Sequence, residues 1–217
     1  RDGRLGRFDL EWDPHVRRFG SLPAHSGGAS AATSDRPAAP ASGGRLLAFP
    51  GIDAEIAAVA VRYASGPAER YVLPLALVRE PGASSLVSRS SQGPIARLSV
   101  NGKTAFLIDG IDAPDVQRRL FQLIAGERRP VPPARVLAAE QSNSGIVYGN
   151  AFYLKIFRRW ERGVNPEVEM ARFFAKRTAF EFVPRFLGAL ESKGADGSSA
   201  ALAMLQSFVR NGANGWD

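Results

Sequence analysis

The stretch that most constrains the fold is residues 140–174, whose apolar pattern and turn formers predict a pair of strands and then a helix. Residues 146–148 are apolar and favour a short strand, and residues 152–157 favour a second one. Gly149 and Asn150 lie between the two runs, and both residue types tolerate the positive φ angles of a tight turn. The sequence therefore predicts an antiparallel hairpin here.

The helix after this hairpin has clear start signals. Gly163 breaks the extended chain, and Asn165 is a suitable N-cap. Pro166 suits the first helical position, because its missing N–H would have no partner there. Glu167 and Glu169 fall in the first turns, where the helix dipole favours negative charge.

Two charged residues of this stretch suggest chemistry. Lys155 lies within an otherwise apolar strand, and Glu169 follows on the next helix. A protein kinase small lobe has this layout, in which a strand lysine holds ATP phosphates and pairs with a helix glutamate. The polar residues 142–145 precede the hairpin and would bring backbone N–H groups to a phosphate. The structural alternative is a solvent-facing lysine and a glutamate that only caps the helix, and spacing alone leaves both open.

Two longer segments carry a more specific signal. They read AEQSNSGIVYGNAFYLKIFRRWERGVNPEVEMARFF at residues 139–174, and LGALES followed by LAMLQSFVRNGANGW within residues 187–216. They resemble the maltokinase family, closely over residues 135–217 and more loosely at residues 70–78. The combination of Ser-Asn-Ser, LKIFRR and NPEVE in this order makes the resemblance specific. Maltokinases are ATP-dependent sugar kinases with a two-lobed fold like that of eukaryotic kinases, often fused behind a trehalose synthase.

The resemblance implies roles for the charged pair. Lys155 would contact the α- and β-phosphates of ATP, and Glu169 would pair with it and fix its position. Glu167 is the alternative partner, since helical spacing puts the two glutamates roughly 200° apart and only one can face the strand. Glu169 is preferred because the family's helix acid falls at this place, and because Phe173, four residues later, is expected to face the core.

The resemblance also implies the remaining nucleotide contacts. Backbone and hydroxyl donors would cover the phosphates, and the end of the last strand would be a hinge whose backbone bonds adenine between apolar walls. The phosphate-contacting residues are Ser142, Asn143 and Ser144, the hinge residues are Gln206, Ser207, Phe208 and Val209, and the walls are Val147 and Leu205. Without the resemblance, the hinge reads as a buried strand end. Gly145 and Asn214 depart from the family, which more often has a hydroxyl residue and an acid there.

The N-terminal part reads as further β-structure. Residues 1–20 are a charged segment, and residues 21–44 are a flexible linker rich in Ala, Ser, Gly and Pro. Residues 45–129 form a cap subdomain of about five strands. The clearest hairpin in it turns at Asn101 and Gly102. The strands are expected at residues 45–49, 56–63, 71–78, 95–100 and 104–108.

A helix is expected at residues 113–125, where Asp112 would cap the start and Gly126 follows the end. Its apolar face would lie on the sheet of the cap subdomain. The residues of that face are Val116, Leu120, Leu123 and Ile124.

The fold class is therefore α+β. A β-rich N-terminal cap subdomain is followed, at residues 130–217, by a protein-kinase-like small lobe made of an antiparallel sheet and one main helix. Strands at residues 186–190 and 200–209 would complete that sheet. By the resemblance, the large lobe is absent from this chain, and the catalytic aspartate and the Mg²⁺ ligands would lie there. We therefore expect no catalytic or metal-binding residue in this chain, and no catalysis by the chain alone.

The complete enzyme, by the same resemblance, would transfer the ATP γ-phosphate to maltose, giving maltose 1-phosphate for α-glucan (glycogen) synthesis. A non-catalytic alternative stays open, in which the chain is a cap and docking module of a trehalose-synthase fusion protein with vestigial kinase features. Retained nucleotide binding would distinguish the two.

Composition bears on other classes. The 217 residues include no cysteine, so disulfides and thiolate metal sites are excluded, and the two histidines, His15 and His25, lie near the N-terminus. No apolar run approaches the roughly 18 residues of a membrane-spanning helix, and no secretory signal is recognised, so a cytoplasmic location is expected. The net charge of +7 would suit nucleic acid, but the basic residues are scattered in pairs without an aromatic platform. A solvated basic surface is therefore favoured over nucleic-acid binding, which would be steeply salt-dependent.

Overall fold

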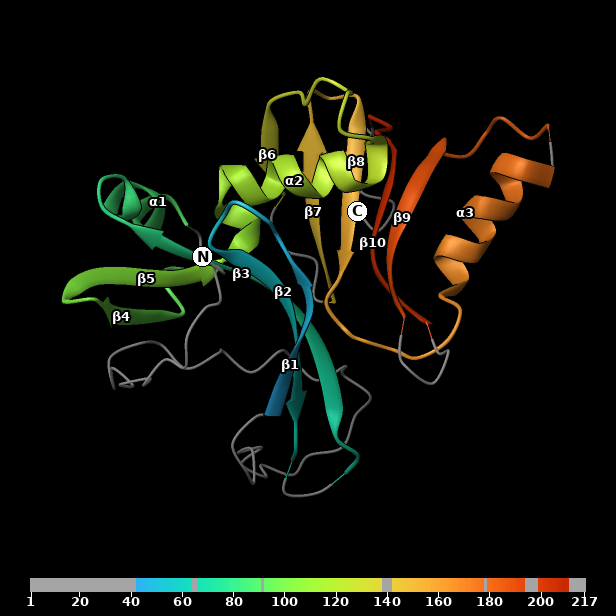
Figure 1. Ribbon diagram of the computed structural model, residues 1–217. Helices are drawn as coiled ribbons and strands as arrows, with labels where there is room; N and C mark the ends of the chain where they lie inside the picture. Colours follow the sequence, from blue (N-terminus) through green and yellow to red (C-terminus); the bar gives the residue numbers. More distant parts are fainter. Residues whose placement is uncertain are drawn as a thin grey trace, which may run out of the picture.

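The computed structural model describes residues 42–210, apart from residues 64–65, 91, 138–141, 178 and 194–198. Within this part the protein is α+β, as expected, with two five-stranded antiparallel sheets and three α-helices. The first sheet is blue to green in Figure 1 and the second is yellow to red. The expected N-terminal segment and nearly all of the expected linker lie outside the described residues. None of the described helices is long and apolar enough to cross a membrane.

The first sheet contains the strands expected for the cap subdomain, in the order β1-β2-β3-β5-β4. Its hairpin at Asn101 and Gly102 is confirmed, because both residues have positive φ, 53° and 73°. The strands are β1 (Ser42–Ala48), β2 (Ala54–Val61), β3 (Glu69–Arg79), β4 (Ala96–Val100) and β5 (Lys103–Asp109).

The second sheet has the same relative order, β6-β7-β8-β10-β9. In each sheet a helix connects the third strand to the fourth: α1 (Ala83–Arg89) in the first, which the sequence analysis did not predict, and α3 (Pro166–Arg177) in the second. The strands of the second sheet are β6 (Ala134–Val136), β7 (Asn143–Tyr148), β8 (Phe152–Phe157), β9 (Phe186–Lys193) and β10 (Ser199–Ser207).

Helix α2 (Pro114–Ala125) begins after a short 3₁₀ turn, η1 (Gly110–Asp112). The expected cap by Asp112 is wrong: the N-cap position is Ala113, and the Asp112 carboxylate instead accepts a hydrogen bond from Ser90 Oγ at 2.6 Å. Gly126 ends the helix with φ 95°, as expected.

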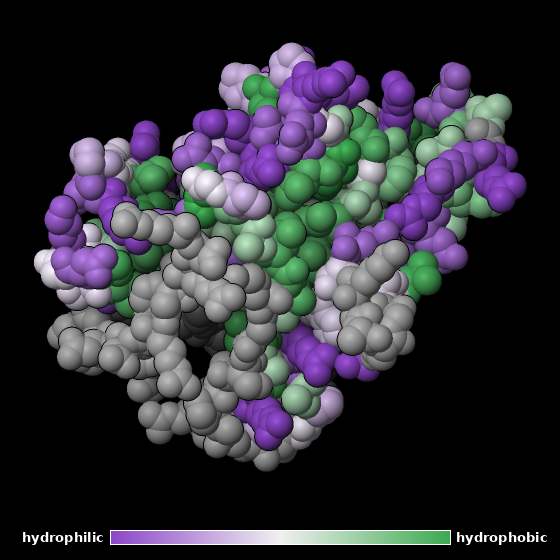
Figure 2. Space-filling model, viewed as in Figure 1, coloured by the Kyte–Doolittle hydropathy of each residue, from purple (hydrophilic) through white to green (hydrophobic). Residues whose placement is uncertain are grey.

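Helix α2 packs on the second sheet rather than on the first, which corrects the sequence expectation. The Tyr148 hydroxyl donates to the Gln117 carbonyl at 2.7 Å, and the rings of Phe121 and Tyr148 lie 4.8 Å apart. Phe121 is fully buried, whereas Leu123, which was expected on the apolar face, is 39% exposed. Figure 2 shows the hydrophilic outer side of this helix at the top of the molecule, with hydrophobic residues below it.

Gly188 on β9 allows α2 to approach closely. A Cβ atom at this position would lie 2.8 Å from Cγ2 of Ile124, and real Cβ atoms essentially never come so near.

We expect Gly188→Ala to lower the free energy of unfolding by about 1–3 kcal/mol, the usual cost of overpacking. Ile124→Ala removes the opposing methyl group, so the double variant should be more stable than the sum of the two single effects indicates. Urea unfolding of the four proteins checks this. Additive effects would contradict the close contact.

The two sheets are joined by a seam of main-chain hydrogen bonds between β3 and the residues that follow β8. Val72 N–H donates to the Arg158 carbonyl at 2.7 Å, and Trp160 N–H donates to the Arg70 carbonyl at 2.8 Å. Tyr71 and Arg159 form an antiparallel bridge between these bonds. One cluster of buried residues includes side chains from both sheets, so the sheets share a core.

The guanidinium of Arg158 crosses the seam. Its Nη2 donates to Asp109 Oδ2 at 2.6 Å, and its Nε donates to Ser144 Oγ at 2.9 Å. Burial raises the pKa of Asp109, and the positive charge of Arg158 opposes that shift. The carboxylate therefore needs this partner to remain charged inside the protein.

Replacing Arg158 with Leu should destabilise the fold by about 3 kcal/mol, because Asp109 is left largely buried without its cation. The matched control is Arg118→Leu. Arg118 pairs with Asp115 at 2.9 Å on the exposed side of α2, and removing that pair should cost about 0.5 kcal/mol or less. Thermal unfolding followed by circular dichroism compares the two variants. Equal losses would show that the seam pair contributes no more than a surface pair.

Candidate functional site

The two faces of the second sheet differ. Leu154 and Ile156 point to the face covered by α2 and belong to the shared core. Lys155 points to the opposite face, and its cross-strand neighbours are Gly145 on β7 and Met204 on β10. On this opposite face, α3 packs against the β9 side, where Val168 and Met204 belong to a small buried cluster. Lys155 thus lies on the third strand, on a face that α3 covers only in part.

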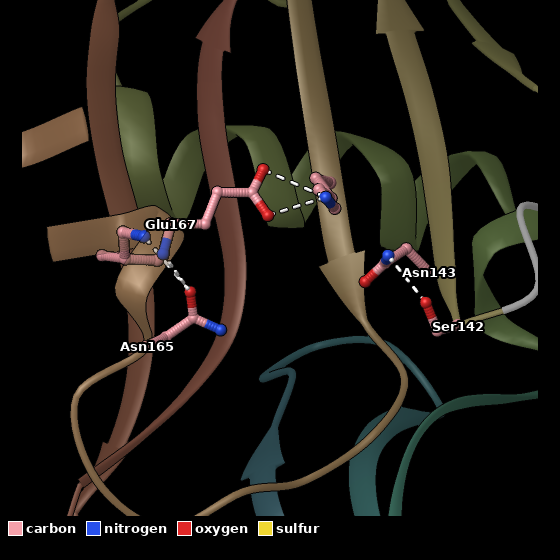
Figure 3. A network of polar contacts seen from close by, with 6 residues as sticks. Ser142, Asn143, Asn165 and Glu167 are labelled. Atoms are coloured by element: carbon pink, nitrogen blue, oxygen red, sulfur yellow. Dashed lines mark hydrogen bonds and ion pairs between the residues drawn. The ribbon is translucent and has the colours of Figure 1, made fainter. Parts of the chain in front are cut away.

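Lys155 forms an ion pair with Glu167 on α3. Its Nζ lies 3.0 Å from Oε1 and 2.7 Å from Oε2, and Figure 3 shows the Glu167 carboxylate reaching from the helix toward the strand. The lysine side chain is 17% exposed and the glutamate side chain 44%. The predicted N-cap is confirmed, because Asn165 Oδ1 accepts hydrogen bonds from the N–H groups of Glu167 and Val168 at 3.0 and 3.2 Å.

The partner of Lys155 is therefore Glu167 and not Glu169, the residue that the sequence analysis preferred. The preference relied on Phe173 to mark the buried side of the helix, but Phe173 is 50% exposed. Ala171, four residues after Glu167, packs against the buried cluster instead. Helical spacing puts Glu167 on the side of Ala171 and Glu169 on the opposite side.

A double-mutant cycle tests this pairing. Lys155→Met and Glu167→Gln should show a coupling of about 0.5–1 kcal/mol in the free energy of unfolding, as for an ion pair at the protein surface that is only partly buried. Glu169→Gln is the matched control: it removes the same charge from the same helix end, so its coupling to Lys155 should be near zero. The reverse result would restore Glu169 as the partner.

The Ser-Asn-Ser run is not a free loop, because β7 begins at Asn143 and Ser144 already pairs with Ile156. Ser142 and Asn143 contact each other, with Nδ2 of Asn143 donating to Oγ of Ser142 at 3.1 Å, and lie near the Lys155 face (Figure 3). The Ser144 side chain is buried on the other face, where it accepts from Arg158. This differs from the expectation that its hydroxyl would be a phosphate donor.

Tyr153 lies on the same face of the sheet as Lys155, and it was not among the residues predicted from the sequence. It lies opposite Val147, which is only 2% exposed. A Cβ atom on Gly145 would lie 2.6 Å from Cε2 of Tyr153, so the ring extends across the glycine. This contact gives a physical reason for the glycine at this position. The alternation of side chains would have placed Tyr153 beside Lys155, since the two are separated by one residue of a strand.

The expected hinge residues lie where β10 ends. Gln206 and Ser207 pair with Tyr153 and Phe152 on β8. The Ser207 N–H donates to the Arg185 carbonyl at 2.8 Å, and the Phe208 N–H donates to the Ala151 carbonyl at 2.9 Å.

These two hinge donors are therefore already bonded, whereas Val209 beyond them is 60% exposed. Leu205 is fully buried opposite Leu154 in the shared core, so it does not line the Lys155 face as expected. Val147 does point to that face, where it lies opposite Tyr153.

A cleft of about 290 Å³ opens where β7 begins and β8 ends. Among its polar lining residues, donor groups and cations outnumber anions, since Glu161 is the one acid in the lining. The cleft is lined by Ser142, Asn143, Phe157, Arg159, Glu161, Arg162, Gly163, Val164, Asn165, Pro166 and Ala201.

Within the described residues, no group of three or more His, Cys, Asp or Glu side chains could hold a metal ion. No protein-family model matches the chain.

Proposed function

We propose that the chain supplies the nucleotide-binding small lobe of an ATP-dependent sugar kinase of the maltokinase type. The observation that carries the proposal is the contact of both Glu167 oxygens with Lys155. The lysine lies on the third strand of an antiparallel sheet and the glutamate on the helix that follows. Protein kinases use a lysine and a glutamate at these places to hold ATP.

The pair suits a phosphate ligand chemically. Lysine is a compact charge with three donors, so Lys155 can contact a phosphate while Glu167 still fixes its position. Its limited exposure strengthens the attraction, because a charge pair interacts more strongly away from bulk water. Ser142 and Asn143 add hydroxyl and amide donors nearby. Mg²⁺ would neutralise charge on the β- and γ-phosphates, and none of the described residues is assigned as its ligand.

Tyr153 suits the base of the nucleotide, whereas Val147 behind it is only 2% exposed and leaves almost no surface for contact. An aromatic ring beside a buried valine offers a surface on which a purine can stack, and stacking of this kind tolerates any base. Backbone contacts to adenine would come from Val209 and the residues after it, since the Ser207 and Phe208 N–H groups are already bonded.

The assignment of the sugar substrate is based on the resemblance of residues 135–217 to the maltokinase family. It implies transfer of the γ-phosphate to maltose, with maltose 1-phosphate as the product, and an association with trehalose synthase. No described residue is assigned to the sugar, and the catalytic aspartate is assigned to no residue of this chain.

ATP binding tests the proposal directly. Lys155→Met should weaken ATP binding at least tenfold, because a charged hydrogen bond to phosphate is lost, while the fold is retained. Arg118→Ala on the outer side of α2 should leave the affinity unchanged. Calorimetric titration of each variant with ATP and MgCl₂ measures the affinities, and maltose phosphorylation by the complete protein provides a second readout. Equal affinity of the Lys155→Met variant and the unmodified chain would overturn the assignment.

A non-catalytic docking module is the second candidate, and one surface favours it. Four apolar side chains on and just after α3 are half exposed or more, and exposed apolar patches often mark contact surfaces. They are Met170 at 51%, Phe173 and Phe180 at 50%, and Phe182 at 90%. A chain that binds no ATP but binds a trehalose-synthase-like domain would support this candidate over the kinase.

A further inference from the structure

Arg159 continues the row of side chains that begins at Lys155. Lys155 and Phe157 point to the same face of β8, and alternation along extended chain places Arg159 next in that row. Phe157 and Arg159 both line the cleft, together with Ser142 and Asn143. The cleft therefore opens at the point where the Lys155 face ends.

The distance along the row suits a polyphosphate. Four residues of extended chain separate the Cα atoms of Lys155 and Arg159 by about 13 Å. Both side chains are long and lie on the same face, so one extended anion can contact both of their charged ends. A phosphate chain that starts at Lys155 and runs past Phe157 would enter the cleft beside Arg159.

The first sheet holds Arg159 in place. Its Nη2 lies 3.0 Å from Oε1 of Glu69 at the start of β3, and its backbone forms the bridge with Tyr71. A second acid, Glu161, is more distant, at 3.4 Å from Nε, and its side chain is 72% exposed. Glu69 is therefore the contact that can fix the direction of the guanidinium.

Glu69 is itself fixed by two tyrosines. The hydroxyls of Tyr71 and Tyr63 both donate to Oε2, and these hydroxyls also contact each other. The bond from Tyr71 is the main reason that the pKa of Glu69 lies below its usual value, and the bond from Tyr63 and the charge of Arg159 add to the shift. Glu69 is thus ionised at neutral pH and immobilised.

Arg159 keeps donors for a ligand. A guanidinium has five N–H groups, and among the described residues its ion pairs engage Nη2 and Nε only. Nη1 remains to bind an anion, and an arginine fork matches the oxygens of a phosphate. The Ser142 hydroxyl and the Asn143 amide line the same cleft and can complete the coordination.

We propose that Arg159 binds the terminal phosphate of a nucleoside triphosphate whose nearer phosphates lie at Lys155, and that Glu69 is the positioning residue for Arg159. This inference rests on the nucleotide-binding function proposed above. It makes the first sheet part of the ligand site, because Glu69 and its two tyrosines belong to β3 and the residues between β2 and β3.

The first test compares ATP with ADP. Arg159→Ala should weaken ATP binding about tenfold and ADP binding less than twofold, because only ATP carries the terminal phosphate that Arg159 contacts. Arg159→Lys keeps the charge but loses the planar fork, and it should recover only part of the difference. Lys155→Met should weaken both nucleotides. Calorimetric titration of the chain at fixed Mg²⁺ measures each affinity.

The second test separates positioning from simple electrostatics. If Glu69 were only a nearby negative charge, Glu69→Gln would tighten binding of an anion. If Glu69 positions Arg159, the same change should weaken ATP binding about threefold to tenfold and leave ADP unchanged. Glu161→Gln is the matched control, because it removes a negative charge that lies near the same guanidinium but keeps the closer contact with Glu69. Because Glu161 also lines the cleft, the loss of its negative charge should tighten ATP binding slightly and should not weaken it.

Three outcomes would overturn the inference: equal loss of ATP and ADP affinity in Arg159→Ala, no loss in either, or tighter ATP binding in Glu69→Gln. The Arg159 comparison does not depend on Glu69, so it remains decisive if Glu69→Gln does not fold. If Lys155→Met loses ATP and Arg159→Ala does not, this inference fails and the proposed function stands.

Inorganic tripolyphosphate covers the remaining case, in which the unmodified chain binds no nucleotide and the proposed function fails. Binding of tripolyphosphate that is lost in Arg159→Ala would then leave Arg159 as an anion-binding residue. Absence of tripolyphosphate binding would overturn the inference as well.

Discussion

Arg158 is the residue on which the relation between the two sheets depends. Its guanidinium bonds Asp109 on β5 and Ser144 on β7, and its carbonyl accepts from Val72 on β3. Its N–H donates to the Ser142 carbonyl at 3.2 Å. Arg158 therefore connects the first sheet to the second sheet at the start of β7. It lies three positions after Lys155, the lysine of the candidate site.

The three cations of the LKIFRR segment each pair with an acid from a different element. Lys155 pairs with Glu167 of α3, Arg158 with Asp109 of β5, and Arg159 with Glu69 of β3. The end of β8 is thus the point where the helix and both sheets meet electrostatically. Paired cations keep defined directions, and an exposed lysine or arginine without a partner would sample many rotamers.

Local signals were enough to predict much of this fold. Both hairpin turns are where the sequence places them, and Asn150 has the positive φ of 53° that its turn requires. The Asn165 cap was predictable because the side chain bonds backbone only two and three residues away. These features depend on neighbours in sequence, so tertiary structure does not change them.

The errors come from tertiary contacts. The choice between Glu167 and Glu169 depends on which side of α3 packs on the sheet, and Phe173, which is half exposed, obscures that side in the sequence. The face of the sheet to which the Ser144 side chain points depends on the residue at which β7 begins to pair with β8. The position of α2 depends on Gly188, because the absence of a side chain there leaves room for Ile124 of α2. Ile124 is 64 residues earlier in the chain.

The seam between β3 and residues 158–160 also has a consequence for folding. Most neighbouring strands within each sheet are consecutive in the chain, and such hairpins close quickly because little chain entropy is lost. The seam joins segments far apart in sequence, and contacts of that kind slow folding. During synthesis the first sheet must remain without its seam partners until the chain beyond Trp160 has left the ribosome. Its apolar residues that belong to the shared core are exposed in that interval, and this is the stage at which the protein is most prone to aggregate.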